Sequence, residues 1–133
     1  MNRLETEEWK SKITHYVETA EIRCEYGMYR FPILGFNTEE LGVRIEKTSF
    51  KMAYVLSIWS VEKHEDVASK GCLERFLADL FGMKDILSAN DVHWIGIEHV
   101  LSPHLERMLA EWGWKQTGGF VHSFYRELEK PFG

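Results

Sequence analysis

The sequence predicts an α/β (α+β) fold in which a mixed, mostly antiparallel sheet of five to seven strands is flanked by helices. Three observations support this prediction. Hydrophobic residues make up 44% and charged residues 28% of the 133 residues, which is enough apolar material for a core. Stretches with strand periodicity and stretches with helical periodicity follow one another along the chain. No Ser/Gly-rich linker divides it, so we expect one domain over residues 1–133, with 1–27 as an N-terminal helical segment.

The N-terminal half is expected to begin with a helix from Glu5 to about Glu21. Its apolar residues recur at spacings of three and four, and Thr6 stands where an N-cap is needed. Three strands should follow, at Met28–Phe36, Leu41–Thr48 and Ala53–Val61. The second alternates apolar residues with Arg44 and Glu46, which is typical of a strand with one solvent-facing side. The third is almost entirely apolar, which is typical of a central strand.

The C-terminal half alternates helices and strands. We expect a helix at 73–81, a strand at Val92–Val100, a helix after Ser102, and closing strands at Trp114–Gln116 and from Phe120 to about Leu128. Gly82 stands where the first of these helices would end, and Ser102-Pro103 is a typical N-cap and first-turn pair. The strand–helix–strand unit in the middle requires a parallel crossover.

Charge and cysteine usage exclude several classes of protein. The formal net charge is −5, from 21 acidic and 16 basic residues, which argues against a strongly basic nucleic-acid binder. No apolar run approaches the roughly 20 residues of a membrane-spanning helix, and the acidic N-terminus does not resemble a secretory signal, so no membrane partner is expected. Cys24 and Cys72 have no CxxC spacing and fit reduced thiols in the cytoplasm.

The strand, loop and helix from Ala53 to Phe81 contain the first candidate binding site. A helix that begins after a central strand presents free backbone N–H groups, which suit a phosphate. Gly71 would allow a ligand to approach the backbone closely, Ser69 could cap the helix or donate a hydrogen bond, and Lys70 adds positive charge. An ordinary helix start with a serine cap explains the same residues.

The order of elements from Met28 to Leu128, together with Gly71 and the Gly113-Trp114 pair, resembles the GNAT superfamily of acyl-CoA-dependent N-acyltransferases. In that family an antiparallel run ends in a splayed strand, and the following loop and helix hold the pyrophosphate of coenzyme A. A further strand, a helix and a terminal hairpin complete the fold. The resemblance implies acetyl-CoA or another acyl-CoA as cofactor, and an amine of a small molecule or a protein as acceptor.

The family's pyrophosphate motif is Arg or Gln, two residues, Gly, any residue, and then Gly or Ala. On residues 68–73 of this chain only the first glycine matches, as Gly71, whereas Ala68 and Leu73 replace the Arg/Gln and the second small residue. The resemblance implies that a pyrophosphate would be held by the backbone amides of Ser69, Lys70, Gly71, Cys72 and Leu73.

The family's later motif is Asn, then Tyr seven residues on, and Gly-Phe at the end of the helix. Here Ser102 stands for the Asn, Gly113-Trp114 matches Gly-Phe, and Leu109 stands for the Tyr that family members use as general acid toward the departing thiolate. Leu109 cannot donate a proton. The resemblance implies that Ser102 contacts the pantetheine arm, as would the backbone of Ser60 and Val61 where two strands splay.

Catalysis would need a base for the amine and a proton donor for the thiolate. The candidates are Glu98 and His99 before the last helix, Glu62 at the end of the central strand, and Tyr125 on the final strand. Solvated or ion-paired carboxylates and a hydrogen-bonded histidine explain the same residues.

No metal site is expected from the histidines. His93 and His99 lie about 20 Å apart along an extended strand, at roughly 3.3 Å per residue. His99 and His104 straddle a turn, but no H-x-x-x-H pattern or cysteine accompanies them. Cys72 at a helix start has no assignable partner histidine, so we expect an inert thiol.

Three functions therefore remain open. The first is a GNAT-like N-acyltransferase that transfers an acetyl or acyl group to an amine by direct attack. The second is a non-catalytic GNAT-fold binding or assembly protein, which would resemble small divergent members carried by phages and mobile elements. Its exposed edge strands and acidic N-terminal helix would then be interaction surfaces, in a homodimer. The third is an unrelated α+β ligand-binding module that shares only the order of elements. This alternative stays open because the family usually opens with a strand, whereas this chain is expected to open with a helix.

Overall fold

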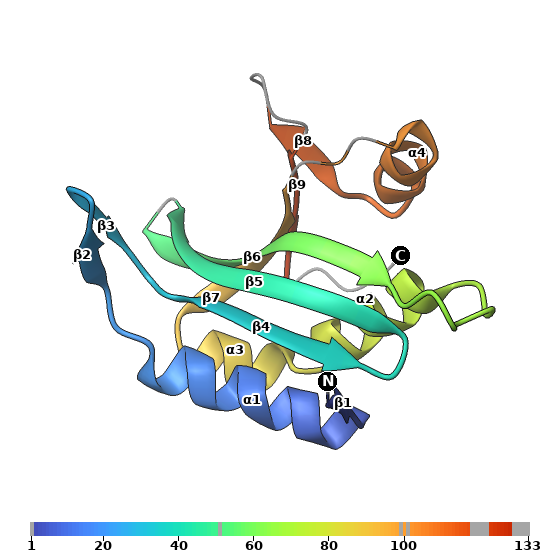
Figure 1. Ribbon diagram of the computed structural model, residues 1–133. Helices are drawn as coiled ribbons and strands as arrows, with labels where there is room; N and C mark the ends of the chain where they lie inside the picture. The colour runs from blue at the N-terminus through green and yellow to red at the C-terminus, as the bar shows by residue number, and fades with distance from the viewer. Residues whose placement is uncertain (1, 51, 99, 101, 118–122, 129–133) are drawn as a thin grey trace.

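The computed structural model describes residues 2–50, 52–98, 100, 102–117 and 123–128. The strands are β1 Arg3–Leu4, β2 Arg23–Glu25, β3 Met28–Arg30, β4 Ile33–Thr38, β5 Leu41–Phe50, β6 Ala53–Lys63, β7 Val92–Ile97, β8 Lys115–Thr117 and β9 Ser123–Glu127. The helices are α1 Thr6–Thr19, α2 Cys72–Phe81, α3 Lys84–Ala89 and α4 Pro103–Glu111. Seven strands form one sheet in the order β1-β4-β5-β6-β7-β9-β8, and β2 and β3 form a separate hairpin (Figure 1).

The sheet is mixed and mostly antiparallel, as predicted. Strands β4, β5 and β6 form an antiparallel meander, and β7 pairs with β9 and β9 with β8 in the same antiparallel way. The β6–β7 pair is parallel, which confirms the predicted crossover through α2. The short β1 pairs in parallel with β4, at Asn37 and Thr38, so the chain opens with a strand and not with a helix as expected.

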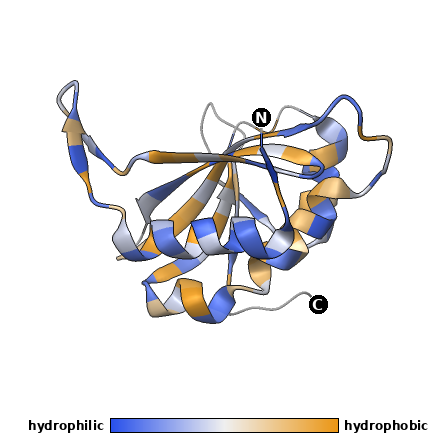
Figure 2. Cartoon of the chain, turned by 60° about the horizontal axis from the view of Figure 1, so that its bottom comes forward, coloured by the Kyte–Doolittle hydropathy of each residue, from blue (hydrophilic) through white to orange (hydrophobic). Residues whose placement is uncertain are grey.

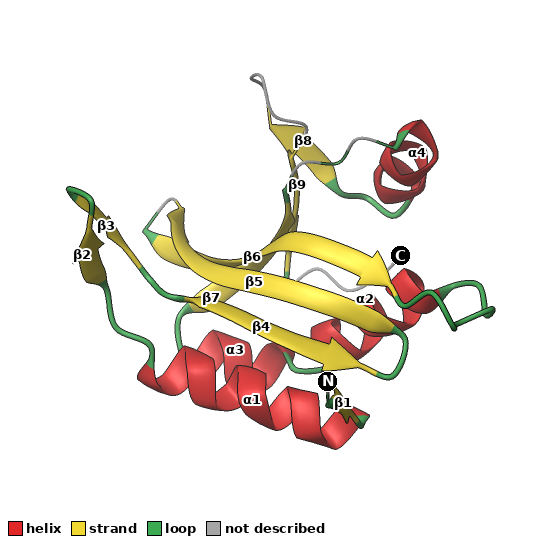
Figure 3. Ribbon diagram, in the orientation of Figure 1, coloured by secondary structure: helices red, strands yellow, loops and turns green. Residues whose placement is uncertain are grey.

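Helices cover the two faces of the sheet unequally. Figure 3 shows α1, α2 and α3 on one face, and α4 on the other side, next to β8. The core lies under the first three helices, where Ile13, Leu77, Leu80 and Leu87 are all fully buried against the sheet. Burial of one such side chain stabilises the fold by about 1.5–3 kcal/mol.

The N-terminal third differs from the sequence prediction in two places. The predicted strand Met28–Phe36 is two strands, β3 and β4, because Pro32 has no backbone N–H to continue a ladder and the chain turns there. Helix α1 is capped by Glu5 and not by Thr6, and the backbone N–H of Glu5 donates to the Glu8 carboxylate (3.1 Å).

Strand β5 breaks the alternation that its sequence suggests. Glu46 is only 3% exposed, although it was expected beside Arg44 on the solvent side. Arg30 of β3 reaches over this position and its guanidinium forms a bidentate pair with the Glu46 carboxylate, at 2.9 and 3.1 Å. The hairpin thus covers a charged residue whose burial would otherwise be costly.

Two features of the C-terminal half were not predicted. Helix α3 lies between α2 and β7, in a segment with too few residues to show a clear period. The register of β7 against β6 shifts at His93, between the pairs Tyr54↔Val92 and Val55↔Trp94. This bulge ends the simple alternation along β7 that was expected.

Candidate functional site

The parallel strands β6 and β7 separate at their C-terminal ends. Their register ends at the pair Ile58↔Ile97, and the backbone N–H of Glu98 makes one further bond to the Ile58 carbonyl (2.9 Å). Beyond this point β6 continues to Lys63 along β5 alone. Trp59 has no opposite residue in β5, because Arg44 pairs with Ser60 and Ile45 with Ile58. A bulge of this kind bends its strand, and here it coincides with the separation.

A cavity of about 400 Å³ lies between the separated strands and the start of α4. This volume is within the usual range of small-ligand pockets. Six residues that were expected to form the site line it: Ser60, Val61, Glu62, Leu73, Glu98 and Ser102. Apolar side chains, among them Ile58, Ile97 and Leu105, form the rest of the wall. The cavity thus combines a mainly apolar wall with polar groups at the strand ends.

Glu98 is held at the edge of this cavity by two hydroxyl groups of β9. Ser123 Oγ donates to one carboxylate oxygen (2.5 Å) and the Tyr125 hydroxyl donates to the other (2.8 Å). Burial, followed by the bond to Glu98, raises the pKa of Tyr125 to about 12, so this phenol stays protonated near neutral pH. The structure thus brings together Glu98 and Tyr125, which are 27 residues apart in the sequence.

A second hollow, of about 390 Å³, lies on the sheet surface over β4, β5 and β6. Ser60 and Glu62 line both this hollow and the cavity between β6 and β7. Both side chains are exposed. A molecule in the surface hollow would therefore meet a ligand in the cavity at Ser60 and Glu62.

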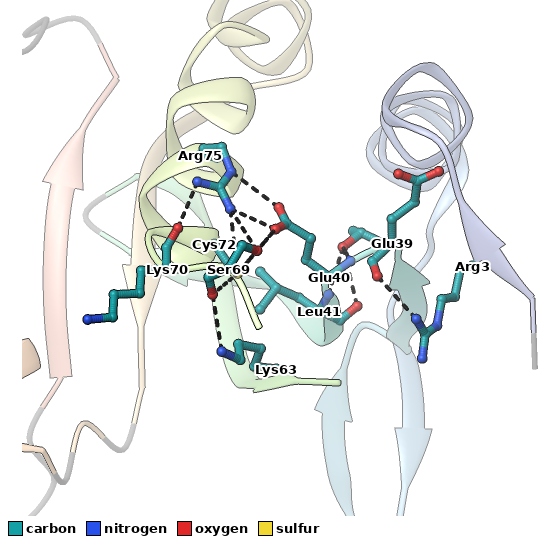
Figure 4. A network of polar contacts seen from close by, with 10 residues as sticks. Arg3, Glu39, Glu40, Leu41, Lys63, Ser69, Lys70, Cys72 and Arg75 are labelled. Carbon is teal, nitrogen blue, oxygen red and sulfur yellow. Dashed lines mark hydrogen bonds and ion pairs between the residues drawn. The ribbon is translucent and has the colours of Figure 1, made fainter. Parts of the chain in front are cut away.

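The loop before α2 ends at a glycine in the left-handed conformation. Gly71 is the N-cap residue, with φ +76°, and no side chain caps the helix there. The first N–H groups of such a helix have no partner within the helix, so they suit an anion. The side chain of Lys70 is exposed and points away from Glu40 and Arg75, which lie beside the same helix start (Figure 4).

That polar network is built around the carboxylate of Glu40. Figure 4 shows Glu40, from the turn between β4 and β5, facing the start of α2. The carboxylate accepts hydrogen bonds from Arg75 (2.6 and 3.2 Å), Ser69 Oγ (2.6 Å) and Cys72 Sγ (3.3 Å). These bonds, the Arg75 bond above all, lower the pKa of Glu40 to about 2. Ser69 and Cys72 thus point toward Glu40, whereas Leu73 lines the cavity.

The cavity and the helix start together fit a coenzyme A thioester. An acyl–pantetheine arm is a narrow chain with two amide groups, which suits a cavity with an apolar wall and polar groups at the strand ends, and the first turn of α2 offers N–H groups to phosphate. The Glu40 carboxylate beside this end of α2 is bound by the side chains of Arg75, Ser69 and Cys72.

Several residues of these polar networks could not be predicted from the sequence. Ser123, Glu40 and Arg75 have no local signal, because each acts through a residue at least 25 positions away. Leu109, in place of the family's tyrosine, is fully buried in the core. His99, a candidate base, lies outside the described residues.

With its separated parallel pair, the chain has the fold of solved GNAT-family acetyltransferase structures. Solved structures with this fold are similar to the chain. The AtaT Y144F mutant toxin bound to the C-terminus of the antitoxin AtaR is 9% identical, with a TM-score of 0.56, over 70% of this chain and 61% of that chain. The same toxin with the antitoxin C-terminus and acetyl-CoA is 10% identical, with a TM-score of 0.55, over 89% of this chain and 74% of that chain.

Two further structures show the same architecture. The KacTA–DNA complex is 12% identical, with a TM-score of 0.56, and the match covers 76% of this chain and 67% of that chain. A GNAT-family acetyltransferase from Listeria monocytogenes 4b F2365 is 12% identical, with a TM-score of 0.50, over 74% of this chain and 63% of that chain. The matches to the AtaT structure without acetyl-CoA and to the Listeria protein thus span less than two thirds of those chains, at 61% and 63%. No protein-family model and no curated protein matches the sequence.

None of the helices in the described part of the chain has the length and apolar character needed to cross a membrane.

Proposed function

We propose that this protein is an N-acyltransferase that transfers an acetyl or other acyl group from acyl-CoA to an amine. The observation that carries the proposal is the cavity between β6 and β7, lined at the strand ends by Ser60, Val61, Glu98 and Ser102. The AtaT structure with acetyl-CoA, which has the same fold, supports the choice of cofactor. We further propose that residues 1–133 form one GNAT-like domain and that it acts in the cytoplasm.

In this proposal the thioester supplies an activated acyl carbon, and the chain supplies the binding groups. The backbone of Ser60 and Val61, freed where β7 leaves β6, would pair with the pantetheine amides, and Ser102 would contact the same arm. The backbone amides of Ser69, Lys70, Gly71, Cys72 and Leu73 would hold the pyrophosphate. Leu73 would lie along the arm, because it is part of the cavity wall.

The acceptor amine would enter through the hollow over β4, β5 and β6. The amine nitrogen forms a bond to the acyl carbon as the C–S bond breaks. Its proton goes to Glu62 or Glu98, directly or through water, and the thiolate takes up a proton from Tyr125 or from water. Glu62 is the carboxylate that borders both hollows, and Glu98 is the one that hydroxyl groups orient. A general base of this kind contributes about 10²–10⁴-fold.

A second candidate function is a non-catalytic protein-binding role on the same fold, as in the second expectation from the sequence. It is favoured by Leu109, which fills the core where the family has a catalytic tyrosine. AtaT is a toxin bound to the C-terminus of an antitoxin, and KacTA is complexed with DNA, so proteins of this fold act with macromolecular partners. The partners that we propose for this chain are a protein and, in a homodimer, a second copy.

Calorimetric titration with acetyl-CoA and with coenzyme A tests the proposal. Micromolar binding to the wild-type protein is expected, and Ser60→Trp should abolish it, because an indole at the splay would fill the cavity. Ser49→Trp is the matched control, since Ser49 is exposed on β5 at the far end of the same hairpin.

Absence of binding at millimolar ligand would overturn the acyltransferase proposal and leave the protein-binding role. Equal loss of affinity in Ser60→Trp and Ser49→Trp would show that the ligand does not occupy this cavity. Substitution of Gly71 is a poorer test, because its positive φ makes any side chain strained and a Cβ there would lie 2.9 Å from Glu74 Oε2.

A further inference from the structure

The β2–β3 hairpin extends away from the sheet and helices (Figures 1 and 2). Its two-residue turn is Tyr26-Gly27, with φ +51° and +76°, as a type I′ turn requires. All residues of β2 are exposed, as are Met28 and Tyr29 of β3. An isolated two-stranded hairpin is only marginally stable in water, so contacts outside the hairpin are expected to stabilise this one.

The hairpin segment also concentrates exposed apolar surface. Of the eight large hydrophobic side chains that are exposed among the described residues, four lie between positions 22 and 29: Ile22, Tyr26, Met28 and Tyr29. Tyr29 is 79% exposed and Ile22 is 50% exposed. Exposed apolar side chains that are concentrated in one segment mark an interaction surface more often than scattered single residues do.

The two edges of the hairpin are not equally available. On β3, Arg30 is held by the Glu46 carboxylate and lies over the Trp59 ring at 6.0 Å. On β2, neither Arg23 nor Glu25 forms a salt bridge with a described residue. β2 pairs with β3 alone among the described strands.

The register of the hairpin determines which backbone groups of β2 face outward. Glu25 and Met28 flank the two-residue turn, so they form the hydrogen-bonded pair that closes it. Hydrogen-bonded and non-hydrogen-bonded pairs alternate in an antiparallel ladder. The next pair, Cys24↔Tyr29, is therefore non-hydrogen-bonded within the hairpin, and the N–H and C=O of Cys24 point away from β3.

We propose that two copies of this chain associate through β2, antiparallel to each other about a two-fold axis at Cys24, to form a four-stranded sheet. In this register Cys24 lies opposite Cys24 of the second copy, and their outward N–H and C=O groups form the central hydrogen-bonded pair. Arg23 lies opposite Glu25 of the second copy, and Glu25 opposite its Arg23.

Charge complementarity favours a second copy as the occupant. The sequence Arg23-Cys24-Glu25 is self-complementary about its centre, so a two-fold axis there makes two opposite-charge pairs. A shift of one residue in the register between the two β2 strands would remove both charge pairs. The pairing deepens the homodimer proposed above but does not depend on acyl transfer, and it is tested without acyl-CoA, so either proposal can fail alone.

Charge-reversal variants test the register by sedimentation velocity between micromolar and near-millimolar protein. Arg23→Glu and Glu25→Arg should each weaken the dimer by about tenfold or more, because each places like charges opposite one another twice. The double variant Arg23→Glu/Glu25→Arg should restore wild-type affinity, since the swapped pair is again self-complementary. Arg107→Glu, the same charge change on the exposed side of α4, is the control and should not alter the dimer.

A crosslinking experiment tests the position of the axis. Opposite residues of a hydrogen-bonded pair have Cα atoms about 5.5 Å apart, within the range for a disulfide. Diamide, which takes two electrons and two protons from the two Cys24 thiols, should produce a covalent dimer that Cys24→Ser abolishes. A monomeric wild-type protein, single variants that bind as well as wild type, a double variant that is not restored, or no Cys24 crosslink in the dimer would each overturn the proposal.

Discussion

The ring of Tyr125 lies so close to Gly96 that a Cβ at that position would be 2.8 Å from Tyr125 Cε1. The two residues are opposite one another in the β7–β9 ladder. The absence of a side chain on β7 therefore lets the phenol lie across the strand and reach Glu98. The position of the proposed proton donor thus depends on a glycine in β7, the third strand from the β8 edge of the sheet.

Gly96→Ala tests this dependence. The new methyl group would also meet Val55 Cγ1 at 3.2 Å, so the ring must move and the substitution should cost about 1–3 kcal/mol of unfolding free energy. Urea denaturation measures the cost. Gly35→Ala on β4 is the matched control, because a Cβ there meets only ordinary contacts at 3.9 Å or more. Equal stability of the two variants would contradict the close packing of Tyr125.

Tyr125→Phe separates the hydroxyl from the ring. If Tyr125 and Glu98 act together in acyl transfer, the variant should lose about 10²-fold or more in kcat with little change in acetyl-CoA affinity. Glu98→Gln should show the same pattern, and its addition to Tyr125→Phe should cost little more. Tyr29→Phe, at an exposed tyrosine outside the site, serves as control. A loss of affinity with unchanged kcat would assign the pair to binding.

Glu40 should make the stability of the protein sensitive to acid. Its pKa in the folded protein is about 2, against an ordinary value of 4.5, so the folded state binds its proton less readily than the unfolded state. The contribution of Glu40 is therefore complete above pH 4.5 and is lost as the pH falls toward 2. Urea melts over this pH window should show a flatter stability profile for Glu40→Gln than for wild type. Parallel profiles would show that the network around Arg75 does not stabilise the fold.

The pair of Arg30 and Glu46 should be needed to join the hairpin to the sheet. Arg30→Met would leave the Glu46 carboxylate, which is 5% exposed, without its partner, and should lower the unfolding free energy by about 1–3 kcal/mol. The double variant with Glu46→Met should recover part of the loss, because no buried charge remains. Chemical denaturation of the four proteins measures the coupling, and additive losses would argue against it.

Leu109→Tyr restores the family's residue but should not restore a general acid. Leu109 has no exposed surface, so a tyrosine would overpack the core and cost about 1–3 kcal/mol. Leu105→Tyr, at a half-buried position on the same helix, should cost less. A stable and more active Leu109→Tyr variant would show that the side chain can turn toward the cavity.

The sequence by itself determined the order of the main elements, because that order follows from local periodicity. The apolar run at Ala53–Val61, the stripe on α2 and the Ser102-Pro103 start of α4 each carry their signal within a few residues. The parallel β6–β7 pair follows from the helix between the strands, and with it the placement of Ser60, Glu62, Glu98 and Ser102 around one cavity.

Only the tertiary structure decided which side chains work as partners. Glu46 can be buried because Arg30 of the β2–β3 hairpin pairs with it. The sequence predicted one continuous strand over Met28–Phe36 and therefore did not reveal this hairpin. Ser69 and Cys72 face Glu40, and Glu98 is oriented by Ser123 and Tyr125, across separations of 25 to 32 residues. Such contacts leave no local pattern, because they depend on how distant segments meet in space and not on the period of any one of them.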